Sequence, residues 1–148
     1  MNIFILDNDP EQAAIYLMDK HVVKMALETA QMLSTINGGP YKVTHEHHPC
    51  VLWAKSTLGN YKWVVKHGLA ICKEYTYRFN KTHKCEEVIW LLEDPYGIAL
   101  PPGSTPHVQC MPEMFKNEDV VTAYRDYYAT KAGFAKWTKR EEPAWWMT

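Results

Sequence analysis

Residues 7–31 read DNDPEQAAIYLMDKHVVKMALETAQ and decide most of the fold. Asp9 is a good N-cap for a helix that begins at Pro10, and the glutamine three residues after Asp9 completes a capping-box pattern. Apolar residues then recur at steps of three and four, the period of a helix with one buried face. The sequence NGGP at 37–40 ends this pattern. We therefore expect one continuous helix from about Pro10 to Thr35.

The other side of this expected helix carries reactive and charged groups. Lys20, Lys24, Glu28 and Gln31 are spaced four, four and three residues apart, so they line up along the helix axis, with His21 beside them. An ordinary solvated face with a Lys24–Glu28 ion pair is one interpretation. The other is a ligand-facing stripe, in which these groups converge on a concavity walled by aromatic rings from elsewhere in the chain.

Length and composition favour a small intracellular domain. A chain of 148 residues fits one domain, 1–148. The net charge of −1 argues against a strongly electrostatic, non-specific DNA binder, although Lys131, Lys136, Lys139 and Arg140 form a local basic cluster. Six Trp and nine Tyr offer stacking surfaces for bases or sugars.

The cysteines and the apolar runs bear on the compartment. The four cysteines are widely spaced without a CxxC pair, which is typical of reduced thiols in a cytosolic protein. Asp7 and Asp9 interrupt the apolar start, so we expect no signal peptide, and no apolar run is long enough to span a membrane. The sequence therefore predicts a cytoplasmic protein without a membrane partner.

The rest of the chain is also mainly α. Residues 2–6 are either a lone strand or an extended arm packed on the core, and the aromatic, charged tail at 134–146 is expected to fold back over the domain. The fold class is thus a compact, single-domain helical bundle with an extended N-terminal segment. Further helices are expected at about 49–57, 60–79 (with Asn60 as cap), 83–93 and 118–131.

Several residues outside the first helix are candidates for contacting nucleic acid or a nucleotide. Arginine pairs with phosphate through a bidentate fork, and arginine combined with aromatic rings is the composition of a base-stacking surface. A packed aromatic core with arginines at its rim is the alternative. The candidates, in addition to His21, Lys24 and Gln31, are His47, His48, Trp53, His67, Arg78, Tyr124, Arg125, Tyr128, Trp137 and Arg140.

The loop cluster His45-x-His47-His48-x-Cys50 is a candidate for a transition metal, because imidazole and thiolate are zinc ligands. A second half of the site would have to come from His83, Cys85 or His107. Loop histidines that contact a phosphate or a neighbouring helix are the favoured interpretation, so we predict neither a metal nor a cofactor.

Common catalytic motifs such as GxSxG, the P-loop, GxGxxG and HExxH are absent from the sequence. The catalytic candidates are therefore Lys20, which forms a Schiff base if burial lowers its pKa, and the carboxylates Asp19 and Glu28. A salt-bridged or solvated Lys20 is the alternative.

Three blocks of sequence carry a family resemblance over nearly the whole chain. The opening DNDPxxAAxYxxDKHVVKMxxExxQ, the central HPCxxW and NYxW, and the ending AYRxYY…KWxxRxxPxW resemble a family of small tailed-phage proteins. More remotely, the chain resembles the endonuclease V-type pyrimidine-dimer DNA glycosylases of T-even phages. Those enzymes are short and all-α, with an Ala…Leu-Met helix similar to Ala13…Leu17-Met18 here and an aromatic segment similar to residues 123–128. The resemblance implies a compact helical domain with its N-terminal segment threaded between helices.

The resemblance also implies a catalytic arrangement. In that family the free α-amino group of a small second residue attacks the sugar C1′, and the catalytic glutamate lies five residues after Leu-Met. Here the second residue is Asn2, so we expect Met1 to be retained, and Val23 stands at the position of the glutamate. Asp19 and Glu28 are the nearby carboxylates. The family's DNA-gripping arginines have no counterparts, although Lys20 and Lys24 lie close to their positions.

These observations give one leading hypothesis and two alternatives. The first is a phage-type DNA glycosylase acting on damaged or modified pyrimidines, with AP lyase activity as an extension; Lys20 or the N-terminal amine would be the nucleophile, and His21 and Lys24 would hold phosphate. The second is a non-catalytic protein that sequesters a nucleotide immune signal in the host cytoplasm. The third is an interaction module that inhibits a host factor through its tail aromatics. The partner is thus DNA or a nucleotide-type ligand, and a homo-oligomer is compatible with either.

Overall fold

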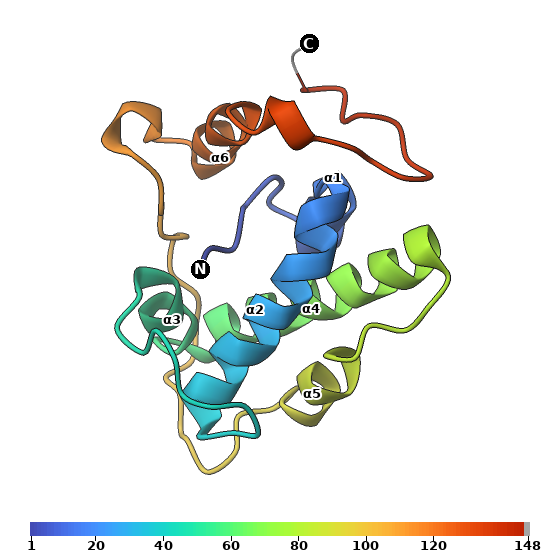
Figure 1. Ribbon diagram of the computed structural model, residues 1–148. Helices are drawn as coiled ribbons and strands as arrows, with labels where there is room; N and C mark the ends of the chain where they lie inside the picture. Colours follow the sequence, from blue (N-terminus) through green and yellow to red (C-terminus); the bar gives the residue numbers. More distant parts are fainter. Residues whose placement is uncertain (147–148) are drawn as a thin grey trace.

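The computed structural model describes residues 1–146, and in this part of the chain the regular structure is entirely helical (Figure 1). This confirms the mainly α fold class. None of the described helices is long and apolar enough to cross a membrane. The α-helices are α1 (Pro10–Tyr16), α2 (Asp19–Asn37), α3 (Pro49–Ala54), α4 (Leu58–Phe79), α5 (Glu86–Leu91) and α6 (Val120–Ala129), and the 3-10 turns are η1 (Glu113–Phe115) and η2 (Ala132–Phe134).

The expected single helix over 10–35 is wrong, because Leu17 and Met18 adopt extended backbone and separate α1 from α2. The backbone groups freed by this break find partners outside the helix. The Met18 N–H donates to the Tyr128 hydroxyl at 3.0 Å, and the Asp19 N–H donates to the Lys136 carbonyl at 2.7 Å. A break whose freed groups are all bonded costs little, so tertiary contacts override the helical periodicity of the sequence.

Local signals at the helix starts are partly confirmed. The Asp9 carboxylate caps α1 by accepting the Glu11 N–H at 3.3 Å, as expected. In a capping box the Gln12 side chain would accept the Asp9 N–H. Here the Asp9 N–H instead donates to the Asp7 carboxylate at 2.9 Å. The expected cap of the long helix at Asn60 is wrong, because Thr57 caps α4 and the Asn60 N–H donates to its hydroxyl at 3.1 Å. α3 and α5 are also shorter than expected.

The core lies between α2 and α4, with the N-terminal segment inside it. Residues 3–6 are buried and form no strand, which confirms an arm packed on the core, although Phe4, with a φ of 58°, turns the arm. In Figure 1 this arm lies between α2 and α6, so the chain begins in the middle of the molecule. α2 and α4 come close at Gly68, where an added Cβ would lie 2.5 Å from Thr29 Cγ2.

The C-terminal segment folds back over the helices, as expected. The Trp137 indole N–H donates to the Tyr16 carbonyl at 2.9 Å, and the Thr138 N–H donates to Asp19 at 2.9 Å. Trp137 is buried, and Trp145 and Trp146 are half-buried against the domain. The tail tryptophans therefore pack against the helices, whereas Phe134 of the same tail is exposed.

Candidate active site

The N-terminal amine lies beside a buried carboxylate of α2. The Met1 nitrogen is 3.6 Å from Glu28 Oε1, and the Asn2 N–H donates to the same oxygen at 3.2 Å. Glu28 is only 8% exposed, although the helical pattern placed it on the polar side. The Met1 side chain is 1% exposed while the residue as a whole is half-buried, so its accessible surface belongs to main-chain atoms. The amine is thus anchored by an apolar side chain and paired with one carboxylate.

Asn2 fixes the direction in which the chain begins. Its side-chain amide donates to the Cys110 carbonyl at 2.8 Å, and its side-chain oxygen accepts from the Tyr124 hydroxyl at 3.0 Å. The same hydroxyl accepts the Cys110 N–H at 3.1 Å. Residues from α2, α6 and the segment before η1 therefore hold the amine in one place. This rigidity is a property that a nucleophile needs.

A second group of reactive side chains, His48, Cys50 and Cys110, lies close to the amine. We call it the thiol–imidazole cluster, and its potential ligand atoms all lie within 4.8 Å of one another. The two thiol sulfurs are 3.4 Å apart, and the Cys50 N–H donates to His48 Nδ1 at 3.1 Å. The hydrogen bond from Cys50 lowers the pKa of the Cys110 thiol to about 7, and the same bond together with burial raises that of Cys50. Burial, and then the positive N-terminal amine, lower the pKa of His48.

Two of the four residues in the metal candidate from the sequence therefore belong to this cluster. His48 and Cys50 belong to the cluster, whereas His45 and His47 are exposed to solvent outside it. None of the three expected second-half residues contributes. His83 Nδ1 accepts the Cys85 N–H at 3.0 Å at the start of α5, and His107 packs against the Trp53 ring with centroids 4.6 Å apart.

A patch of three ammonium groups surrounds His21. The His21 ring is buried, stacks on Phe4 with centroids 4.6 Å apart, and has Nδ1 2.7 Å from the Tyr128 hydroxyl. Burial, and then the positive charge of lysines 131, 24 and 20, together lower the pKa of His21 to about 4. His21 is thus neutral at pH 7 and cannot supply the phosphate-binding charge that the sequence suggested. The positive charge around His21 belongs to the lysine patch (Lys20, Lys24 and Lys131), and Lys24 lies one helical turn before Glu28.

Asp19 and Arg78 build the junction between helices, which differs from the roles that the sequence suggested. The Arg78 guanidinium donates to Glu74 at 2.9 Å, to Asp19 at 3.1 Å, and to the carbonyls of Leu17 and Ile15 at 2.7 and 2.8 Å. The Arg78 side chain is fully buried. Since its donors are all directed into the protein, it is not available to a phosphate, and Asp19 is not available to handle protons.

The remaining predicted contacts fall into two groups. His67, Trp53, Tyr124 and Tyr128 are buried and therefore pack the core, which was the alternative interpretation. Other residues keep some exposure but have internal partners: Arg125 donates to the Leu6 carbonyl at 3.0 Å, and Arg140 donates to Glu74 at 2.8 Å. Gln31 is half-buried, and His47 is exposed beside Glu46. Residues 20–31 therefore do not converge on one concavity, because Glu28 faces the amine, His21 lies under Phe4, and the lysines face solvent.

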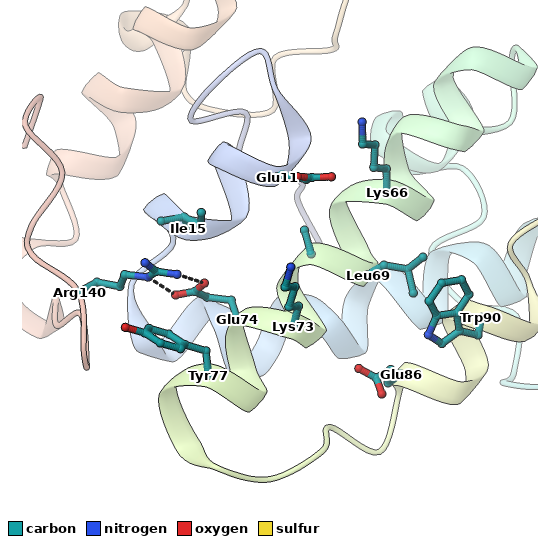
Figure 2. A pocket seen from close by; sticks show the side chains of 11 residues that line it. Glu11, Ile15, Lys66, Leu69, Lys73, Glu74, Tyr77, Glu86, Trp90 and Arg140 are labelled. Atoms are coloured by element: carbon teal, nitrogen blue, oxygen red, sulfur yellow. Dashed lines mark hydrogen bonds and ion pairs between the residues drawn. The ribbon is translucent and has the colours of Figure 1, made fainter.

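A cavity of about 470 Å³ opens elsewhere, between α1, α4, α5 and the C-terminal segment (Figure 2). Lys66 and Lys73 of α4 and the ring of Trp90 of α5 line it, and the Glu74–Arg140 ion pair closes one side. Arg140 is the one predicted site residue in this lining. The cavity combines ammonium groups with an exposed aromatic ring, and residues 20–31 take no part in it.

Comparison with known proteins identifies the family. The model of the family described as pyrimidine dimer DNA glycosylase matches residues 1–87, more than half of the 148 residues. The chain belongs to the pyrimidine dimer DNA glycosylase family. No curated protein and no solved structure gives a significant match. The part of the chain that matches the glycosylase family contains Met1, Glu28, His48 and Cys50, whereas Cys110 and α6 lie beyond it.

Sequence reasoning missed Asn2 and Cys110 as parts of this site. Cys110 follows a loop rich in proline and glycine, so its spacing from Cys50 contains no information about their distance. Asn2 carries a weak signal, since a polar residue interrupts an apolar start at a position that the glycosylase family uses for chemistry. The amine itself was among the expected nucleophiles, and its contact with Glu28 is the new observation.

Proposed function

We propose that this protein is a DNA glycosylase that excises damaged or modified pyrimidines, with the N-terminal amine as nucleophile and Glu28 as its partner. The observation that carries the proposal is the 3.6 Å distance between the Met1 nitrogen and Glu28 Oε1 in a member of the pyrimidine dimer DNA glycosylase family. Glu28 takes the role that the sequence register assigned to position 23, where Val23 is exposed to solvent.

The chemistry needs an unprotonated amine next to a carboxylate. Glu28 accepts a proton from the ammonium group, and the freed amine attacks C1′ of the sugar while the bond from C1′ to the base nitrogen breaks. The departing base takes the proton from Glu28, and the carboxylate formed in this way stabilises the positive charge on the nitrogen now bonded to C1′. Ring opening then gives an imine between the N-terminal nitrogen and C1′, and β-elimination from this imine breaks the strand on the 3′ side, which is the AP lyase reaction.

The lysine patch supplies the charge that holds the DNA. Lys20 and Lys24 are exposed on α2, on the same side as Glu28, and Lys131 follows α6. Phosphate neutralisation by lysines gives affinity without sequence preference, which suits an enzyme that recognises a lesion. The flipped-out base would be recognised by groups other than these lysines. Lys20 is thereby assigned to phosphate contact and not to nucleophilic attack, because it is exposed and its ammonium group packs over the Phe134 ring, 4.6 Å from the centroid.

Borohydride trapping on ultraviolet-irradiated and abasic duplexes tests the proposal. We expect a covalent protein–DNA adduct that peptide mass mapping places on residue 1. Acetylation of the N-terminus should abolish the adduct, and Glu28→Gln should lower its rate by roughly 100-fold or more, in the range of a lost general acid–base group. Lys20→Ala should weaken DNA binding and keep the adduct.

The controls separate chemistry from folding. Glu87→Gln removes an exposed carboxylate of α5 and should leave trapping unchanged. Circular dichroism of Glu28→Gln checks that the variant keeps its helical fold, in which the isosteric amide oxygen can still accept the Asn2 N–H. An adduct that maps to Lys20, or that survives N-terminal acetylation, contradicts the proposed nucleophile. The absence of any adduct and of base release from either duplex contradicts the glycosylase assignment.

A second candidate function, sequestration of a nucleotide without catalysis, is favoured by the cavity on α4. Its volume of about 470 Å³ lies in the range of small-ligand sites, and Lys66, Lys73 and Trp90 offer phosphate and base contacts. A thermal-shift panel of mono-, di- and cyclic nucleotides tests it, since a ligand at 100 times its Kd stabilises a protein by about 2.7 kcal/mol. Lys73→Ala should abolish any shift that comes from this cavity, and Lys24→Ala should not.

A further inference from the structure

We infer that the thiol–imidazole cluster is a zinc-class transition-metal site that fastens α3 to the segment carrying Cys110. This inference does not depend on the glycosylase proposal. His48 and Cys50 stand at the start of α3, and Cys110 comes from a segment sixty residues later in the chain. Two thiols and one imidazole are the ligand types that select zinc or a similar borderline ion over calcium or magnesium.

The distances favour a metal over a disulfide. Tetrahedral zinc with bonds of about 2.3 Å to sulfur places two thiolates about 3.8 Å apart, whereas a disulfide requires about 2.05 Å. The two sulfurs lie 3.4 Å apart, near the metal-bound separation. The largest separation in the cluster is no more than 4.8 Å, so a contraction on the order of 1 Å brings three ligands onto one ion.

His48 presents a nitrogen in the form that a metal needs. Its Nδ1 accepts the Cys50 N–H, so this nitrogen is unprotonated, and a metal bound there would replace that hydrogen bond. Three protein ligands leave the fourth tetrahedral position open to water or to a group of the neighbouring N-terminus. The site also has a mechanical consequence. Because the Cys110 carbonyl accepts from Asn2, an ion on Cys110 would stiffen the start of the chain as well.

Metal analysis of the purified full-length protein tests the inference. Protein prepared with reducing agent and without chelator should contain about one zinc per chain by elemental mass spectrometry. Replacing zinc with Co²⁺ should give the visible absorption of a tetrahedral ion together with a thiolate-to-cobalt band in the near ultraviolet. Cys50→Ser, Cys110→Ser and His48→Asn should each lose most of the metal; asparagine retains a cap for α3. His45→Asn, in the same loop, should retain it.

A second measurement covers the case in which a cysteine variant folds poorly. A chelator should lower the Tm of the wild-type chain and of His45→Asn, and restored zinc should raise it again. No zinc and no Co²⁺ spectrum in a chain with four titratable thiols overturns the inference. An intact mass lower by two hydrogens, with Cys50 linked to Cys110, overturns it in favour of a disulfide. A wild-type Tm that changes with neither chelator nor added zinc likewise overturns the inference.

Discussion

Arg78 holds the junction between α1 and α2, and its replacement tests the physical account of that junction. Arg78→Met keeps a similar apolar stem and removes every donor. Glu74 retains Arg140 and Asp19 retains Thr138, so the carboxylates keep partners, whereas the carbonyls of Ile15 and Leu17 lose the guanidinium. Removing one partner of a buried, hydrogen-bonded ion pair costs about 3–5 kcal/mol. A domain stable by about 5–15 kcal/mol would lose about a fifth or more of its stability.

Urea unfolding followed by circular dichroism measures this loss of free energy. Thermal unfolding gives a second measure: for a chain of this length, 2–4 °C per kcal/mol corresponds to a drop in Tm of about 6–20 °C. Lys81→Met, an exposed cation beyond the end of α4, is the matched control and should change the free energy of unfolding by less than about 0.5 kcal/mol. A loss below about 1 kcal/mol for Arg78→Met refutes the reasoning. So does an unchanged stability with weaker DNA binding, because the guanidinium would then contact DNA and not the helix junction.

Three further predictions concern stability and DNA binding. His67 and His21 have native pKa values of about 4, against 6.5 in the unfolded chain, so the unfolded chain binds more protons between these values. The free energy of unfolding should therefore fall as the pH drops from about 6.5 to 4, by up to about 1.4 kcal/mol per pH unit for each histidine. Urea titrations at several pH values measure this fall, and a flat profile contradicts it. Gly68→Ala should cost about 1–3 kcal/mol because its Cβ meets Thr29, and adding Thr29→Ser, which removes that methyl, should restore much of the loss in urea unfolding. Lys24→Ala should weaken DNA binding evenly across sequences and reduce the slope of log K against log salt by about one in anisotropy titrations, and an unchanged slope would remove Lys24 from the interface.

The features that were predictable from the sequence are those set by neighbouring residues. Asp9 caps α1 because its carboxylate is next to the amide groups that it serves, and Asp119 caps α6, which begins at Val120, for the same reason. The stop after Asn37 follows from Gly38, which adopts the left-handed backbone that glycine permits. The break between α1 and α2 was not predictable, since it depends on Tyr128, more than one hundred residues away. The helical period is real on both sides of the break, so the pattern alone favours continuity.

The position of Glu28, the proposed catalytic carboxylate, was hidden for a related reason. Counting five residues from Leu-Met to the expected glutamate assumes that the helix is unbroken over this stretch. It also assumes that the N-terminal amine lies beside the same turn of the helix as in the family. Here the Met1 side chain is buried, and the arm crosses α2 so that the Met1 nitrogen lies near Glu28, more than one turn beyond Val23. The height at which an arm crosses a helix is set by what anchors the arm. In this protein Asn2 provides the anchor through Cys110 and Tyr124, which come from the far end of the chain. An amine and a carboxylate can thus be brought together at a different register. The proposed attack at C1′ would tolerate this change, because it depends on their separation and not on their spacing in sequence.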